Sequence, residues 1–130
     1  MKRCFVLLAV VALATAGCSG GMGRVKGAIV DNGQPVTFPP LTGSVQLSPI
    51  QPDGTPDMNK VYAAVVNEDG TFELVASGGE LAVGMYQVSI ELNGNKGPEK
   101  AKAFAAKVKP IKREIKSGQN TLTIDLSKPD

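Results

Sequence analysis

Short runs of alternating apolar and polar residues limit the folds open to this chain more than any other feature. The clearest runs are "MYQVSIEL" (85–92) and "TLTIDL" (121–126), and "SVQLSP" (44–49) and "FELVA" (72–76) repeat the pattern. Successive side chains of a strand point to opposite faces, so each run predicts a strand with one buried and one solvated face. With the doubly apolar "VYAAVV" (61–66), read as a more central strand, these faces predict a core of Val45, Leu47, Val65, Phe72, Leu74, Tyr86, Val88, Ile90, Leu122 and Ile124.

Turn-forming residues separate the predicted strands. Asn-Gly in "DNGQP" (31–35) and Asp-Gly in "NEDGTF" (67–72) indicate tight turns, because glycine readily adopts positive φ. The stretch "SPIQPDGTPDMN" (48–59) holds three prolines and is predicted to be a loop. About seven short strands separated by such turns predict an all-β sandwich.

The segment 97–110, "GPEKAKAFAAKVKP", departs from this pattern. Its apolar residues Ala101, Phe104, Ala105 and Val108 fall at the spacing of one helix face, and alanine favours helix. A short helix near 99–109 is one interpretation, and an irregular crossover loop is the other.

The N-terminus has the layout of an export signal. Lys2 and Arg3 precede an apolar stretch over 4–16, which is shorter than the roughly 20 residues that a membrane-spanning helix needs. The following "TAGC" (15–18) resembles the lipobox of bacterial lipoproteins, in which the cysteine is lipidated and becomes the mature N-terminus. This resemblance implies a signal peptide over 1–17, lipidation of Cys18 and a flexible tether over 18–23. The alternative is an ordinary secreted chain, cleaved after Ala16, with an incidental cysteine.

The charges of the mature chain balance overall but not locally. Without Lys2 and Arg3, 12 of the 14 basic residues remain against 12 acidic residues, which argues against a nucleic-acid-binding protein. Basic residues concentrate in 96–116. This segment is either a solvated strand edge or a contact surface for anionic lipid or acidic cell-wall polymer. The candidate contact residues are Lys100, Lys102, Lys107, Lys109, Lys112 and Arg113.

Four segments in order carry a resemblance to a known family. They are "VKGAIVDNGQPV" (25–36), "NEDGTFEL" (67–74), "GMYQVSI" (84–90) and "IKSGQNTLTIDL" (115–126). Together they resemble the carboxypeptidase regulatory-like domain, and the resemblance covers 24–127. It implies a seven-stranded Greek-key sandwich of the transthyretin or immunoglobulin-like kind, without catalytic activity in most members.

The residue types available restrict the chemistry further. The chain has no histidine, and its one mature cysteine is the expected lipid site, so we expect no enzyme activity, no cofactor and no metal centre. Two weaker alternatives stay open. Asp53, Asp57 and Asn59 offer oxygen donors for calcium in the 50–59 loop, and Lys26 and Asn120 resemble the Lys–Asn crosslink pair of collagen-adhesin repeats.

These observations predict an exported, lipid-anchored protein of the cell envelope, with the outer membrane favoured over the inner. Its sandwich would serve as a structural or binding module. The alternative is an accessory subunit that recruits an exported enzyme or transporter.

Overall fold

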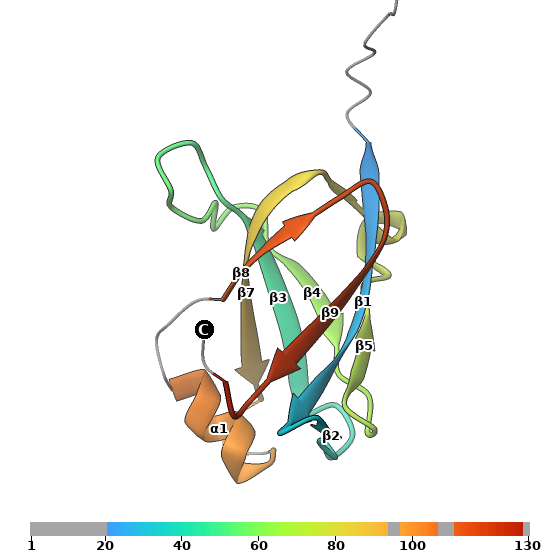
Figure 1. The fold of residues 1–130 in the computed structure, drawn as a ribbon, viewed down its shortest axis with the longest axis vertical. Helices are drawn as coiled ribbons and strands as arrows, with labels where there is room; N and C mark the ends of the chain where they lie inside the picture. The colour runs from blue at the N-terminus through green and yellow to red at the C-terminus, as the bar shows by residue number, and fades with distance from the viewer. Residues whose placement is uncertain (1–20, 94–96, 107–110, 129–130) are drawn as a thin grey trace, which may run out of the picture.

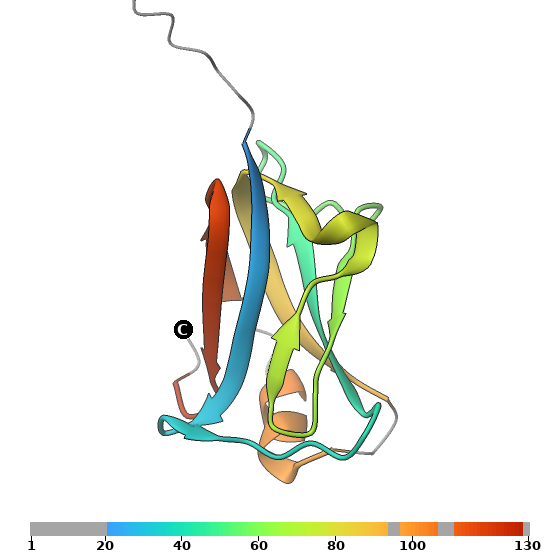
Figure 2. The same ribbon diagram turned by 90° about the vertical axis from the view of Figure 1, so that its right-hand side faces the viewer.

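Two β-sheets packed face to face form the body of the protein, and a short helix closes one end (Figures 1 and 2). The computed structural model describes residues 21–93, 97–106 and 111–128. This architecture confirms the all-β sandwich predicted from the alternating runs.

The first sheet is built around β1 (Met22–Asp31). Along one edge β1 pairs in parallel with β9 (Gly118–Asp125), from Gly23 opposite Gly118 to Val30 opposite Asp125. Its other edge pairs antiparallel with three short strands in succession. These are β6 (Glu80–Ala82), β5 (Thr71–Glu73) and β2 (Gln34–Pro35). The first and nearly last segments of the domain therefore lie side by side.

The second sheet is antiparallel throughout, in the order β4-β3-β7-β8. Its longest strand, β7, is the run "MYQVSIEL" with the glycine before it. A 3-10 turn, η1 (Ala76–Gly79), precedes β6 in the first sheet. The four strands are β4 (Tyr62–Val65), β3 (Gly43–Pro49), β7 (Gly84–Leu92) and β8 (Ile111–Ile115).

The segment with helical spacing does form a helix, α1 (Glu99–Ala106). Two residues of the helix, Ala101 and Phe104, are buried, whereas Ala105 is exposed. The buried face of the helix is therefore narrower than the sequence suggested. Val108 lies outside the described residues. The helix covers one end of the core next to β7 (Figure 1).

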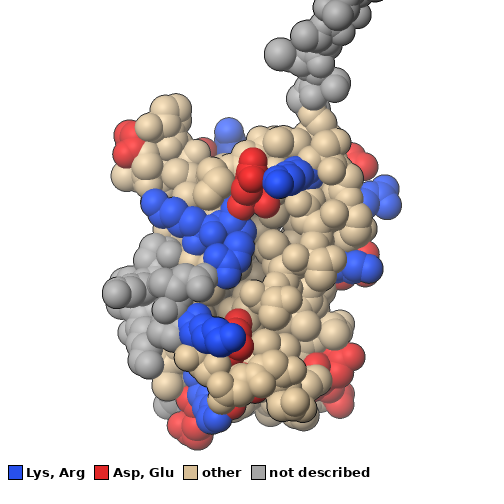
Figure 3. Space-filling model, viewed as in Figure 1, with Lys and Arg blue, Asp and Glu red and all other residues tan. Residues whose placement is uncertain are grey.

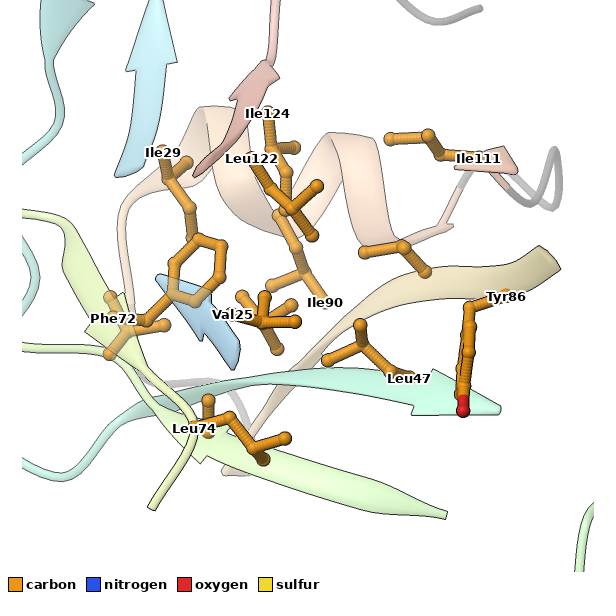
Figure 4. Close-up of a cluster of buried hydrophobic side chains, with 14 of the residues drawn as sticks. Val25, Ile29, Leu47, Phe72, Leu74, Tyr86, Ile90, Ile111, Leu122 and Ile124 are labelled. Carbon is orange, nitrogen blue, oxygen red and sulfur yellow. The ribbon is translucent and has the colours of Figure 1, made fainter. Parts of the chain in front are cut away.

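Side chains from both sheets interdigitate in one core (Figure 4). Nine of the ten predicted core residues are buried, and the exception is Val65, which is 55% exposed. Its neighbours Ala64 and Val66 are buried instead. The strand β4 is an edge strand, not the central one that its sequence suggested. A run that is apolar in both phases does not reveal which phase faces inward, and this is why the prediction for Val65 was wrong.

Gly27 allows the core to close around the middle of β1. It lies between Phe72 on β5 and Leu122 on β9. A Cβ atom added at Gly27 would lie 2.1 Å from the Leu122 carbonyl oxygen and 2.5 Å from the Phe72 ring. The aromatic ring therefore fills the space that a side chain at position 27 would occupy.

Tyr86 stabilises the turn that connects β6 of the first sheet to β7 of the second. Its hydroxyl donates a hydrogen bond of 2.8 Å to the carbonyl oxygen of Ala82, across the turn from β6 to β7. Burial, with a smaller contribution from nearby Tyr62, raises the pKa of Tyr86, so the hydroxyl stays protonated and remains a donor.

Candidate functional surfaces

The two ends of the sandwich differ and are named here by their residues. The proximal pole holds Gly21 and the start of β1, the turn from β6 to β7, the connection from β8 to β9, and the 50–59 loop. The distal pole holds the turn from β1 to β2, helix α1 and residues 126–128. In Figure 1 the chain enters at the top and α1 lies at the bottom.

Cys18 lies outside the described residues, but the structure fixes where the chain after it enters the fold. Strand β1 begins at Met22, which pairs with Ala82. The sandwich therefore starts two residues before the predicted boundary at residue 24, and Met22 and Gly23 belong to a strand and not to the tether. Any tether between Cys18 and the domain is correspondingly short.

The two α1 lysines of the basic segment lie at the distal pole in ion pairs. Lys100 pairs with Asp31, and Lys102 pairs with Glu99 at 2.7 Å. β1 has ten residues, each rising about 3.3 Å, so the two poles are separated by about 33 Å. Electrostatic contact fades over a Debye length of about 8–10 Å at physiological salt. The α1 lysines are therefore too far from the proximal pole to act on a surface that lies across that end of the sandwich.

The remaining basic residues follow β8 toward the proximal pole. Lys112 is exposed, and Arg113 donates a hydrogen bond of 3.0 Å to the carbonyl oxygen of Lys112. Lys116, at the pole itself, lies 3.8 Å from Glu114. Lys107 and Lys109 lie outside the described residues. On the face drawn in Figure 3, blue atoms form one larger group at the middle left and several smaller groups, most of which lie beside red atoms.

The acidic side chains of the 50–59 loop stabilise turns. The Asp53 carboxylate accepts hydrogen bonds from the Thr55 hydroxyl at 2.7 Å and the Thr55 amide at 2.9 Å, and these bonds lower the pKa of Asp53. Asp57 accepts from the Asn59 amide at 3.1 Å. Among the residues that the structure describes, no group of three or more His, Cys, Asp or Glu side chains could hold a metal ion.

The Lys–Asn crosslink is not favoured by the strand register. Asn120 stands opposite the buried Val25, whereas Lys26 is exposed on the other face of β1, opposite Thr121. The Asn120 side chain is also engaged with the backbone. It accepts from the Lys116 amide at 2.9 Å and donates to three carbonyl oxygens, those of Lys116 (2.8 Å), Gly118 (3.1 Å) and Arg24 (3.2 Å).

A hollow of about 320 Å³ on the outer face of the first sheet was missed by the sequence reasoning. Strand pairing sets its floor in two rows. Thr71, Ala28 and Thr123 form one row, and Glu73, Lys26 and Thr121 form the other. The signal was available in the threonines of "TLTIDL", but the partners across the sheet are remote in sequence. Hydroxyls with one cation and one carboxylate can hydrogen-bond a polar ligand, but they include no activated nucleophile.

A second hollow, of about 340 Å³, lies at the distal pole between α1 and the end of β1. Asp31, Lys100, Phe104 and Ser127 are among its lining residues. Because Asp31 and Lys100 pair with each other, the charges on its rim are largely neutralised.

No helix within the described residues is long and apolar enough to cross a membrane. No protein-family model matches the chain, and no curated protein matches it. The carboxypeptidase regulatory-like assignment therefore stays a prediction.

Solved structures share the fold at low sequence identity. A DUF3823 family protein from Parabacteroides merdae matches with a TM-score of 0.56 and 16% identity, over 82% of this chain and 46% of the other. A DUF3823 family protein from Bacteroides ovatus matches with a TM-score of 0.53 and 12% identity, over 80% and 43%. A match to (S)-allantoin synthase, with a TM-score of 0.44, carries no argument. This chain spans less than half of each of these chains. Such identities show a common β-rich fold alone.

Proposed function

We propose that the protein is an exported, lipid-anchored and non-enzymatic component of the cell envelope, whose sandwich serves as a structural or binding module. The observation that carries the proposal is the lipobox-like "TAGC" followed, four residues after Cys18, by the first strand of a complete sandwich. Two acyl chains on Cys18 anchor a protein stably, whereas one chain holds it only reversibly. The outer membrane is the proposed location.

The test of the anchor replaces Cys18 and uses Cys4 as the matched control. Cys18→Ala removes the acylation site, and we expect the protein to leave the membrane fraction. Cys4→Ala changes a cysteine of the signal peptide, and the mature protein should still fractionate with membranes. Mass spectrometry of the N-terminal peptide should show a diacylglycerol-modified Cys18. An unmodified N-terminus, or membrane association unchanged in Cys18→Ala, refutes the anchor.

Anionic contact by the basic segment forms part of this proposal, but the geometry divides the segment. Lys100 and Lys102 lie about 33 Å from the proximal pole, at about 3.3 Å for each of the ten residues of β1. They can serve a cell-wall polymer or a protein, not the bilayer that holds Cys18. Binding of the Cys18→Ala protein to acidic wall polymer should weaken with salt and with Lys100→Gln and Lys102→Gln. If binding changes neither with salt nor with these substitutions, Lys100 and Lys102 do not form the polymer-binding surface.

An accessory role is the second candidate, in which the domain recruits an exported enzyme or transporter. The observation in its favour is that both DUF3823 structures are more than twice as long as the region they share with this chain. In both of those proteins, the region similar to this domain is therefore part of a longer chain. Crosslinking in intact cells, followed by purification through a C-terminal tag, distinguishes the candidates. One stoichiometric partner supports the accessory role, and polymer without protein supports the binding module.

A further inference from the structure

We infer that the proximal pole rests on the bilayer and places Met22, Val83 and Met85 among the lipid headgroups and the first acyl carbons. This inference rests on the proposed lipidation of Cys18 and deepens it, because it assigns the side of the sandwich that meets the membrane.

The chain between the proposed anchor and the fold is short. Met22, the first residue of β1, follows Cys18 by four residues. An extended chain spans at most about 3.6 Å per residue, so Met22 lies within about 14 Å of a lipidated Cys18. The proximal pole therefore cannot move far from the surface, whereas the distal pole, about 33 Å further along the ten residues of β1, is free to point away from it.

The proximal pole exposes apolar side chains. Met22 is 48% exposed, Val83 46% and Met85 44%. Met22 and Val83 lie where the chain enters the fold, because Met22 pairs with Ala82 and the Val83 amide donates a hydrogen bond of 3.3 Å to the Gly21 carbonyl oxygen. Met85 follows at the start of β7, opposite Glu114. Single exposed apolar residues are ordinary on protein surfaces, but a group around one point indicates contact with an apolar partner.

The charged side chains of the proximal pole do not form a basic patch. Each described cation of this pole has a carboxylate close by, since Arg24 lies 3.6 Å from Glu80 and Lys116 lies 3.8 Å from Glu114. The pole also holds Asp53 and Asp57 of the 50–59 loop, so its described carboxylates outnumber its cations, and we expect no attraction to anionic headgroups. Contact should depend on the apolar side chains and resist added salt. This distinguishes it from contact made by a basic patch, which salt weakens.

The test uses the full lipidated protein in phosphatidylcholine vesicles with and without phosphatidylglycerol. Because a lipidated Cys18 has no free thiol, a cysteine introduced by Met85→Cys or Val83→Cys is the only site for a maleimide fluorophore. Leu41→Cys is the control, since Leu41 lies by the start of β3 at the distal end and is 75% exposed. Lipids with a spin label near the headgroup should quench positions 83 and 85 strongly and position 41 hardly at all. Quenching should be equal at low and high salt.

Three results would overturn the inference. Equal quenching at positions 41 and 85 would mean that the domain has no preferred orientation. Positions 83 and 85 shielded from water but not quenched by the lipid would mean that a second copy or another protein covers the pole. Labelling of the parent protein at Cys18 would refute the lipidation, and the inference with it, which separates that failure from a failure of orientation alone.

Discussion

Replacing Asn120 by aspartate should destabilise the sandwich more than replacing it by alanine. The two amide hydrogens of Asn120 are directed at a cluster of backbone carbonyl oxygens between 2.8 and 3.2 Å away, and its oxygen accepts the Lys116 amide at 2.9 Å. These bonds join β1 to the connection between β8 and β9. In Asn120→Asp, a carboxylate oxygen replaces the donor and faces those carbonyl oxygens.

The size of each effect follows from the bonds involved. Asn120→Ala loses about three hydrogen bonds, each contributing about 0.5–1.5 kcal/mol net. The site is only half-buried, so water replaces part of this loss and we expect about 2 kcal/mol. Asn120→Asp keeps the bond from the Lys116 amide, but an acceptor facing acceptors adds a desolvation penalty, and we expect about 3 kcal/mol at neutral pH.

The effect of pH supplies the sharper test. When protonated, the new carboxyl can donate to a carbonyl oxygen, so folding should raise its pKa above the unfolded value. A raised pKa means that the destabilisation is present when the carboxyl is charged and is relieved as the pH falls. The gap between Asn120→Asp and the parent should therefore narrow from neutral pH toward about pH 4, near the reference value for Asp.

Urea unfolding at several pH values measures these differences. Gln119→Glu introduces the same charge one residue away at an exposed position, and it should change stability by less than about 0.5 kcal/mol. The reasoning fails if Asn120→Asp is no more destabilising than Asn120→Ala at neutral pH, or if its effect is independent of pH.

Three further changes test the packing and the turns. Gly27→Ala should lower the free energy of unfolding by about 1–3 kcal/mol, because the added methyl group meets the backbone of Leu122. In Gly43→Ala the methyl group would lie 3.4 Å from its nearest neighbours, so this variant should be near neutral in thermal unfolding. Equal effects of the two variants would contradict the packing described for Gly27. Tyr86→Phe should lower the free energy of unfolding by about 1 kcal/mol, because it loses the hydrogen bond to Ala82. Tyr62→Phe should lower it by less, and the reverse order would contradict the stabilising role of the Tyr86 hydroxyl. A hydrogen bond from the Thr71 hydroxyl lowers the pKa of Asp69, so the charged Asp69 carboxylate stabilises the fold above its ordinary pKa of 3.8, and this stability is lost as the pH falls through the lowered pKa. Asp69→Asn should therefore reduce the fall of the melting temperature in that acid range. An unchanged acid profile would exclude a contribution from this carboxylate.

The strand phases could be predicted wherever one face of a strand is polar. In β7, Gln87 and Ser89 mark the outer face, and this correctly assigned Tyr86, Val88 and Ile90 to the core. The run that became β4 has no polar marker, and Val65 was assigned to the wrong face.

Strand β1 was harder to interpret for a different reason. Val25 and Ile29 are fully buried, but the inward position between them is Gly27, so the alternation is interrupted where β1 is most tightly packed. Its parallel pairing with β9 depends on contacts between residues about a hundred positions apart, which no local pattern records.

The arrangement of the candidate surfaces could be predicted least from the sequence, because neighbours in sequence need not be neighbours in space. Lys100 and Lys112 belong to one basic segment, but one lies on a helix at the distal pole and the other on a strand of the second sheet. Lys26 and Thr121 are remote in sequence yet stand opposite each other in the hollow of the first sheet.

The parallel pairing of β1 and β9 also determines how the domain responds to a mechanical load. A pull on the chain at Gly21 runs along the axis of β1, and β9 holds β1 from Gly23 to Val30. The hydrogen bonds between parallel strands are evenly spaced along the pair, so such a pull shears them all together. A strand peeled from its end would lose them one at a time. The strand by which the chain enters the domain is thus the one arranged to withstand tension.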